Sequence, residues 1–324
     1  LVPEVLAEVT GREVIQLSIT NSHPWKVLEH LAKDPNFRGT VLMDVAPENF
    51  SAAAGHKDSK YDHVEMRLDY CNRASVSPSE QIEGRLSARL TSALVLRQPG
   101  LSLEHLAALH VGAGPGAPEL SPYVLRWDRQ AWLNPVVDQS HWQAAAKATV
   151  KAFGEWTTWL YGGHQPSKPQ YAALQARFHH ALDRLRGRGG DVVMVALPMG
   201  NHLEALQHKA FPRQKFWDKW VTKAGVIGIN YIDFDELNGF IPVDESHLSR
   251  TDARAFSRAL AGILVRLQAG QVPRPRTADP DSVDPPDLAT ALRATSLRVF
   301  GVMLPLSVTV DAAAPPEPMA KGRR

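Results

Sequence analysis

The sequence predicts an α/β protein whose sheet is mostly parallel. Short β-rich or apolar segments alternate with helical patterns near both ends of the chain, which is the order of a sheet built with crossover connections. Most of these segments are apolar on successive residues, as is typical of parallel strands buried on both faces. The four expected strands are Glu13–Ile19, Gly39–Val45, Asp191–Leu197 and Val226–Ile232.

Composition limits the class of protein. The chain has 324 residues, 44% of them apolar and 22% charged, which fits one large globular domain or a domain with an insertion. The formal charge of +2 and the lack of a basic, aromatic stripe exclude nucleic acid as a predicted partner. Cys71 is the sole cysteine, so an internal disulfide is excluded. No stretch has the length of a membrane span.

Residues 1–50 form the expected first part of the α/β core. Helices are predicted at Val2–Thr10 and at about Trp25–Lys33, between the first strands. From 51 to 190 the alternation is lost and helical patterns dominate, which predicts a helical insertion. The helices expected there are Ser77–Arg97, Leu103–His110, Leu120–Leu133, Ser140–Leu160 and Lys168–Leu185.

Residues 191–270 are the expected second part of the core, with helices at Met199–Lys209 and Arg213–Lys223. Residues 271–310 read as a Pro- and Asp-rich linker followed by a C-terminal extension with one more helix and an edge strand. Residues 311–324 are a low-complexity tail that we expect to be disordered. Neither a metal nor a cofactor is predicted, because the histidines lack ligand spacing and the glycine-rich break at 112–116 lacks the Gly-Lys-Ser/Thr ending of a phosphate loop.

The most informative short pattern is Asp244-Glu245-Ser246-His247. A carboxylate three residues before a histidine can hold one imidazole nitrogen and leave the other to take a proton from a nucleophile. A strong helix follows, with Ser249 as its predicted N-cap. Its apolar residues fall on one face, which anchors the helix to the core: Phe256, Leu260, Ile263, Leu264 and Leu267.

This pattern, with its C-terminal helix, resembles the last block of the SGNH (GDSL-type) hydrolase superfamily. The order of four blocks is similar to that of bacterial membrane-anchored SGNH-like proteins: Asp191–Pro198, Phe211-Pro212-Arg213 with Phe216-Trp217, Gly225–Ile232, and Asp244–Leu248. The resemblance implies a flavodoxin-like, three-layer fold. It also implies a serine esterase or O-acyltransferase with His247 as general base and then acid, and Asp244 as its orienting partner. The implied substrate is an acylated small molecule, polysaccharide or lipid at the cell envelope. Membrane attachment would come only through a segment outside this sequence.

Two interpretations of the nucleophile remain open. In the first, Ser22 of Thr20-Asn21-Ser22 is the nucleophile, although Thr20 stands where the family has glycine. In the second, which we favour, the four strands correspond to the family's strands two to five, and the serine-bearing strand precedes Leu1. The oxyanion would then rest on donors near Thr20 and Asn21, or on Asn49. Ser18, within a strand, and Ser246, next to His247, are weaker candidates.

A function of another class is also open. The chain could be a catalytically inactive SGNH-like binding or assembly protein that presents the helical insertion to a partner. The presence or absence of a serine hydroxyl within hydrogen-bond reach of His247 distinguishes the two functions.

Overall fold

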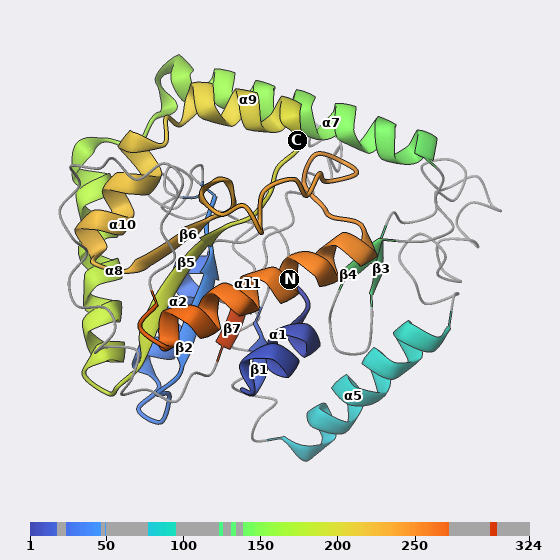
Figure 1. Ribbon diagram of the computed structural model, residues 1–324, viewed down its shortest axis with the longest axis vertical. Coiled ribbons are helices and arrows are strands. Elements are labelled where there is room, and N and C mark those ends of the chain that lie inside the picture. The colour runs from blue at the N-terminus through green and yellow to red at the C-terminus, as the bar shows by residue number, and fades with distance from the viewer. Residues whose placement is uncertain are drawn as a thin grey trace, which may run out of the picture.

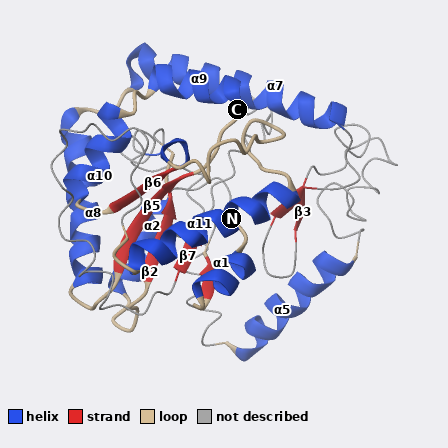
Figure 2. Ribbon diagram, in the orientation of Figure 1, coloured by secondary structure: helices blue, strands red, loops and turns tan. Residues whose placement is uncertain are grey.

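The computed structural model describes residues 1–17, 24–46, 49, 77–94, 123–125, 131–133, 139–271 and 299–302, and these form a mixed α/β protein (Figures 1 and 2). Its main sheet is parallel, with strand order β1-β7-β2-β5-β6. Strands β2, β5 and β6 form a continuous block of three. The strands are β1 (Val14–Gln16), β2 (Thr40–Asp44), β5 (Asp191–Ala196), β6 (Ile227–Asn230) and β7 (Val299–Val302).

The apolar sequences of β2 and β5 are explained by burial on both faces. Every residue of β2 and β5 is buried. Because successive side chains of a strand point to opposite faces, Val41 and Met43 join one core cluster while Leu42 joins the other. The four predicted strands are therefore confirmed, with shorter bounds than the sequence pattern gave.

One face of the sheet is covered by α2 (Pro24–Lys33), α8 (Lys168–Arg186) and α10 (Lys219–Ala224). Trp25 lies at the centre of this layer, with its ring centroid 5.6 Å from that of Phe178 and 5.4 Å from that of Trp220. Helix α8 lies within the range predicted as an insertion, yet its buried residues pack into the same cluster as β2 and β5. It therefore covers the sheet directly.

The opposite face is covered by α1 (Pro3–Thr10) and α11 (Arg250–Gln268), which cross in front of the sheet in Figure 1. Gly11 ends α1 with a left-handed φ of 66°, as the predicted C-terminal glycine requires. Ser249 caps α11 through its Oγ, which accepts from the Asp252 backbone N–H at 3.1 Å. All five apolar residues predicted for the core face of α11 are buried.

Strand β7 contradicts the prediction of an edge strand near the C-terminus. It lies inside the sheet and pairs in parallel with β1 on one side and β2 on the other. A short apolar strand carries no mark of its position in a sheet, because interior and protected edge strands have the same composition.

The predicted helix at Leu120–Leu133 is also wrong. The structure has an antiparallel pair there, β3 (Tyr123–Leu125) and β4 (Ala131–Leu133), with Val124 opposite Trp132. Short apolar runs rich in aromatic and β-branched residues fit either state by periodicity, and cross-strand pairing decides. The helix predicted at Ser77–Arg97 is α5 (Pro78–Ala93), whereas Leu103–His110, the linker from 272 onward and the tail lie outside the described residues.

Two further helices lie over the carboxyl edge of the sheet in Figure 1: α7 (Gln139–Trp159) and α9 (Asn201–Ala210). They share a small cluster that includes Phe153, Leu203 and Phe211. A short π turn follows α7 at Leu160–His164, and another follows α9 at Gln214–Asp218. A 3-10 turn follows β6 at Tyr231–Asp233. Among the described helices, none combines the length and apolar character needed to cross a bilayer.

Candidate active site

A pocket opens where β2, β5 and β6 end. Parallel strands present their carboxyl ends at one edge, which is the usual ligand crevice of open α/β sheets. The strand ends contribute Asp44, Ala196 and Asn230 to the pocket wall, and Ser246 contributes from the Asp-x-x-His loop. The enclosed part of the pocket is small, about 70 Å³, which leaves room for only a small group of a ligand.

Asp244 and His247 belong to the loop from which Ser246 lines this pocket, and they contact each other directly. Asp244 Oδ2 is 2.8 Å from His247 Nδ1, and Oδ1 accepts from the His247 backbone N–H at 2.7 Å. The Asp244 side chain is 2% exposed and that of His247 is 13% exposed, so water screens this contact only weakly. With Nδ1–H donating to the carboxylate, Nε2 is the nitrogen able to accept a proton.

Ser246 completes the turn around Asp244. Asp244 Oδ1 also accepts from the Ser246 backbone N–H at 3.0 Å, and Val243 N–H donates to the His247 carbonyl at 2.8 Å. Ser246 Oγ lies 2.8 Å from His247 Nδ1 and 3.3 Å from Asp244 Oδ1. The hydroxyl is therefore on the carboxylate side of the imidazole, where it helps to orient the ring. It is not on the Nε2 side, where a nucleophile is needed.

Glu245 ties this loop to the start of α9. It has a left-handed φ of 73°, which costs a non-glycine residue roughly 1 kcal/mol. Its Oε2 accepts from the backbone N–H groups of His202 and Leu203 at 3.1 and 2.9 Å, and its carbonyl accepts from Gly200 N–H at 2.8 Å. A carboxylate at a helix N-terminus is favourable, which offsets the backbone strain.

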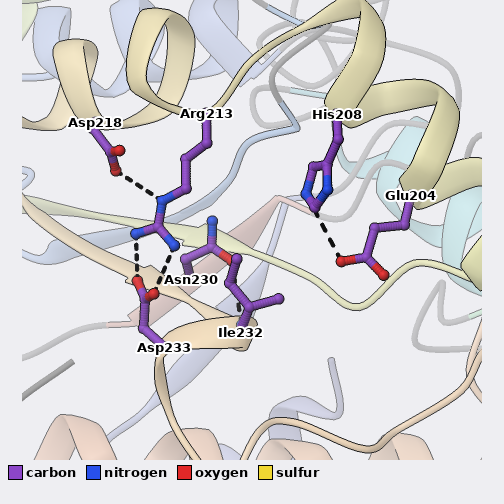
Figure 3. Close-up of polar contacts among 7 residues, drawn as sticks. All are labelled: Glu204, His208, Arg213, Asp218, Asn230, Ile232 and Asp233. Carbon is purple, nitrogen blue, oxygen red and sulfur yellow. Dashed lines mark hydrogen bonds and ion pairs between the residues drawn. The ribbon is translucent and has the colours of Figure 1, made fainter. Parts of the chain in front are cut away.

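Arg213 lies between two carboxylates at the pocket (Figure 3). It donates to Asp233 through both terminal nitrogens, at 2.6 and 2.7 Å, and its Nε donates to Asp218 at 2.9 Å. Burial alone would lower the pKa of Arg213, but the hydrogen bonds that it donates to Asp233 and Asp218, with the charges of these carboxylates, outweigh burial and raise the pKa. This cation therefore stays charged, with its charge balanced inside the protein.

Tyr231 follows Asn230 at the end of β6 and also lines the pocket. Burial raises the pKa of Tyr231, and a hydrogen bond to Glu204 raises it further. Glu204 is also 3.8 Å from His208 Nε2, one helical turn along α9 (Figure 3). Tyr231 therefore stays neutral, and its hydrogen bond to Glu204 joins α9 to the end of β6.

Two asparagines line the same pocket, each with its side-chain oxygen used locally. Asn49 Oδ1 accepts from Ala46 N–H at 2.9 Å, and Asn230 Oδ1 accepts from Ile232 N–H at 3.4 Å. A backbone N–H requires an acceptor, so these contacts identify the oxygen branch of each carboxamide. The NH₂ branches are the donors available to the pocket.

The predicted site residues divide into two groups. Asp244, His247 and Ser246 meet in one loop, and Asn49 shares the pocket with Ser246. Ser18, Thr20, Asn21 and Ser22 lie outside the described residues. Sequence reasoning gave no role to Glu245, Asn230, Tyr231 or Arg213. A signal existed for Asn230, since a polar residue ends an apolar strand there.

A scan of protein-family models finds no match to the sequence. Searches of curated proteins and of solved structures find none either. Functional inference for this chain therefore depends on its own residues and their geometry.

Proposed function

We propose that this chain is an SGNH-like serine esterase or O-acyltransferase that acts on an ester-linked acyl group. The observation that carries the proposal is the contact of Asp244 Oδ2 with His247 Nδ1 at 2.8 Å, in the loop from which Ser246 lines a pocket on the carboxyl edge of the sheet. A buried carboxylate that orients an imidazole is the arrangement that supplies the general base in a serine mechanism.

The chemistry assigns one step to each group. His247 Nε2 takes the proton of a serine hydroxyl as its oxygen attacks the ester carbonyl, and Asp244 stabilises the imidazolium. The tetrahedral intermediate expels the alcohol, which receives that proton from His247, and leaves an acyl-enzyme. A water molecule then releases the acid, or an acceptor hydroxyl takes the acyl group, with His247 again moving the proton.

Strand order bears on the two assignments of the nucleophile. A flavodoxin-like sheet has the order 2-1-3-4-5. If β1, β2, β5 and β6 are strands two to five, the place of strand one is between β1 and β2, where β7 is found. Because β7 occupies that place, a serine-bearing strand before Leu1 would have to replace β7 there. Ser22, which follows β1 in the sequence, is the competing assignment.

The rest of the proposal concerns the domain organisation, the substrate and the cellular location. The core would be a three-layer, flavodoxin-like unit formed by residues 1–50 and 191–270 together with α8 and β7, with the chain between residue 51 and α8 as a helical insertion. The substrate would be an acylated small molecule, polysaccharide or lipid on the extracytoplasmic side of a bacterial envelope. These features depend on the resemblance of the Asp191–Leu248 blocks to membrane-anchored SGNH-like proteins.

A p-nitrophenyl acetate assay tests the proposal. If Ser22 is the nucleophile, the 324-residue chain should hydrolyse the ester; if the serine precedes Leu1, only a protein that includes that segment should do so. In whichever protein is active, His247→Ala should lose most of the activity. The matched control is His180→Ala on α8, away from the pocket lining. Equal rates for all three proteins would reject His247 as the base. Fluorophosphonate labelling with peptide mapping then separates the nucleophiles, because an active protein with unlabelled Ser22 excludes that serine.

One observation favours a second function, partner binding without catalysis. Helix α5, in the predicted insertion, carries Ile82 and Leu86, which are 65% and 55% exposed, and Leu94 directly after the helix is 48% exposed. An apolar stripe on a solvent-facing helix is typical of a binding surface. If the chain forms a stable complex that Leu86→Glu abolishes, and shows no hydrolysis dependent on His247, the binding function replaces the enzymatic one.

A further inference from the structure

The charge balance of the pocket restricts its ligand. Among the described lining residues, Arg213 is the single arginine and there is no lysine. Its guanidinium is held by Asp233 at 2.6 and 2.7 Å and by Asp218 at 2.9 Å. Asp44 adds a further carboxylate to the wall. An anionic ligand would have to displace a carboxylate from Arg213 and approach Asp44, which is unfavourable in a partly buried site.

Two polar side chains on the wall, Asn230 and Asn49, present a donor to a ligand. Asn230 is 8% exposed, and its side-chain Oδ1 accepts from Ile232 N–H. Figure 3 shows its amide nitrogen turned away from Ile232. Asn49 has the same arrangement, because its Oδ1 accepts from Ala46 N–H. Each carboxamide can therefore donate to an acceptor oxygen of a bound molecule.

Most of the remaining wall is apolar, and its polar members are Gln207, His208, Tyr231 and Ser246. Leu203 on α9, with Phe211 and Trp217 beyond it, lines the pocket with buried side chains. A hydrocarbon chain is stabilised on such a wall, whereas a charged group loses its hydration there.

From these three features we infer that the pocket binds the acyl part of an uncharged ester, with the Asn230 amide donating to an acceptor oxygen of the ligand. This inference rests on the proposed function and deepens it. It selects neutral acyl groups, such as acetyl or butyryl, over succinyl and phosphoryl groups. Asn230 is thus a specificity residue at the end of β6.

The test uses ligands that are not turned over. ¹⁵N-labelled protein is titrated with butyramide, with butyrate and with methyl phosphate, and the side-chain NH₂ signals are followed by NMR. Butyramide should shift the signal that is missing in Asn230→Asp, and the two anions should bind at least about fivefold more weakly. Asn230→Asp keeps an oxygen for Ile232 N–H but replaces the donor, so butyramide affinity should fall about tenfold.

Two control variants keep the result interpretable. Asn238→Asp adds the same charge at an exposed turn outside the pocket lining and should leave binding unchanged. Asn230→Ala removes the donor without adding charge and should weaken butyramide binding several-fold. Tighter binding of either anion, or unchanged affinity in both Asn230 variants with native spectra, overturns the inference.

The outcome is separable from that of the proposed function. Binding of butyramide at Asn230 without hydrolysis of any ester would remove the enzymatic proposal and keep the ligand class. If instead 4-nitrophenyl hemisuccinate is cleaved as well as 4-nitrophenyl butyrate, through His247, the enzymatic proposal stands and the selection of uncharged acyl groups is wrong.

Discussion

Asp244 holds His247 at two separate points. One carboxylate oxygen is 2.8 Å from the ring Nδ1, and the other accepts from the His247 backbone N–H at 2.7 Å. The contact with the ring sets the tautomer of the imidazole. The contact with the backbone N–H fixes the position of the His247 backbone, from which the ring extends. These two tasks are performed by different oxygens, so they can be separated by mutation.

Asp244→Asn should separate them. The amide oxygen can still accept from the backbone N–H groups of Ser246 and His247, so we expect the free energy of unfolding to change by at most about 1 kcal/mol. An NH₂ group facing Nδ1 favours the tautomer that protonates Nε2, so esterase kcat should fall about 10²–10⁴-fold. Steady-state kinetics and urea unfolding measure the two effects.

The control is Asp34→Asn, because Asp34 Oδ1 makes the same kind of turn contact with Asn36 N–H at 2.9 Å on an exposed loop. It should leave both kcat and stability unchanged. A large loss of stability in Asp244→Asn, or an unchanged kcat in an active enzyme, would contradict the separation of the two tasks.

Backbone strain and helix capping at Glu245 should make opposing contributions to the free energy of unfolding. Glu245→Ala loses the contacts with His202 and Leu203 N–H but keeps a left-handed residue, so we expect a loss of about 1–2 kcal/mol in unfolding free energy. Glu245→Gly also loses the cap but relieves the φ of 73°, so it should be more stable than Glu245→Ala. The reverse order in urea unfolding would show that strain at this residue is unimportant.

Gly200 offers an independent check of the same contact. A Cβ at this residue would lie 2.3 Å from Glu245 Oε2 and 2.8 Å from Glu245 Cα, so Gly200→Ala must move the Glu245 loop. Because both substitutions disrupt one contact, the double variant Gly200→Ala, Glu245→Ala should lose clearly less stability than the sum of the single losses. Additive losses would mean that the two residues act independently.

Local contacts could be predicted from the sequence, and long-range pairing could not. The Asp244–His247 contact joins residues three apart, and the Ser249 cap joins residues three apart, so a short pattern specifies each. The place of β7 between β1 and β2 depends on residues far apart in the chain. The left-handed Glu245 has no signal at all, because glutamate disfavours that conformation and only the start of α9 stabilises it.

The pocket was partly predictable. Asp44 and Asn49 follow an apolar strand, and parallel strands bring such ends together, so their meeting with the Asp-x-x-His loop follows from the α/β pattern. Arg213 is on a turn that is far along the chain from any strand end. Its pairing with Asp233, twenty residues later, cannot be predicted without knowledge of the fold.

Tyr231 should make stability fall at high pH. Burial, then hydrogen bonding to Glu204, raise the pKa of Tyr231, so the folded state keeps this proton when the unfolded chain has lost it above about pH 10. The unfolded state then binds fewer protons, and the stability due to this residue falls by up to about 1.4 kcal/mol per pH unit. Tyr231→Phe should remove this part of the slope in urea unfolding between pH 9 and 11. Parallel curves for the two proteins would contradict a buried, neutral Tyr231.

The last prediction concerns β7, which is bonded on both sides within the sheet. A chain ending at Gln271 lacks β7, so β1 and β2 each lose a parallel partner along their backbones. We expect this truncation to lower the denaturant midpoint strongly and to increase amide exchange in Val14–Gln16 and Thr40–Asp44. A chain ending at Val310 keeps β7 and loses only the tail predicted to be disordered, so its midpoint should match that of the full chain. If both truncations behave alike, β7 contributes nothing to the sheet, and the place between β1 and β2 must be filled by another segment or closed.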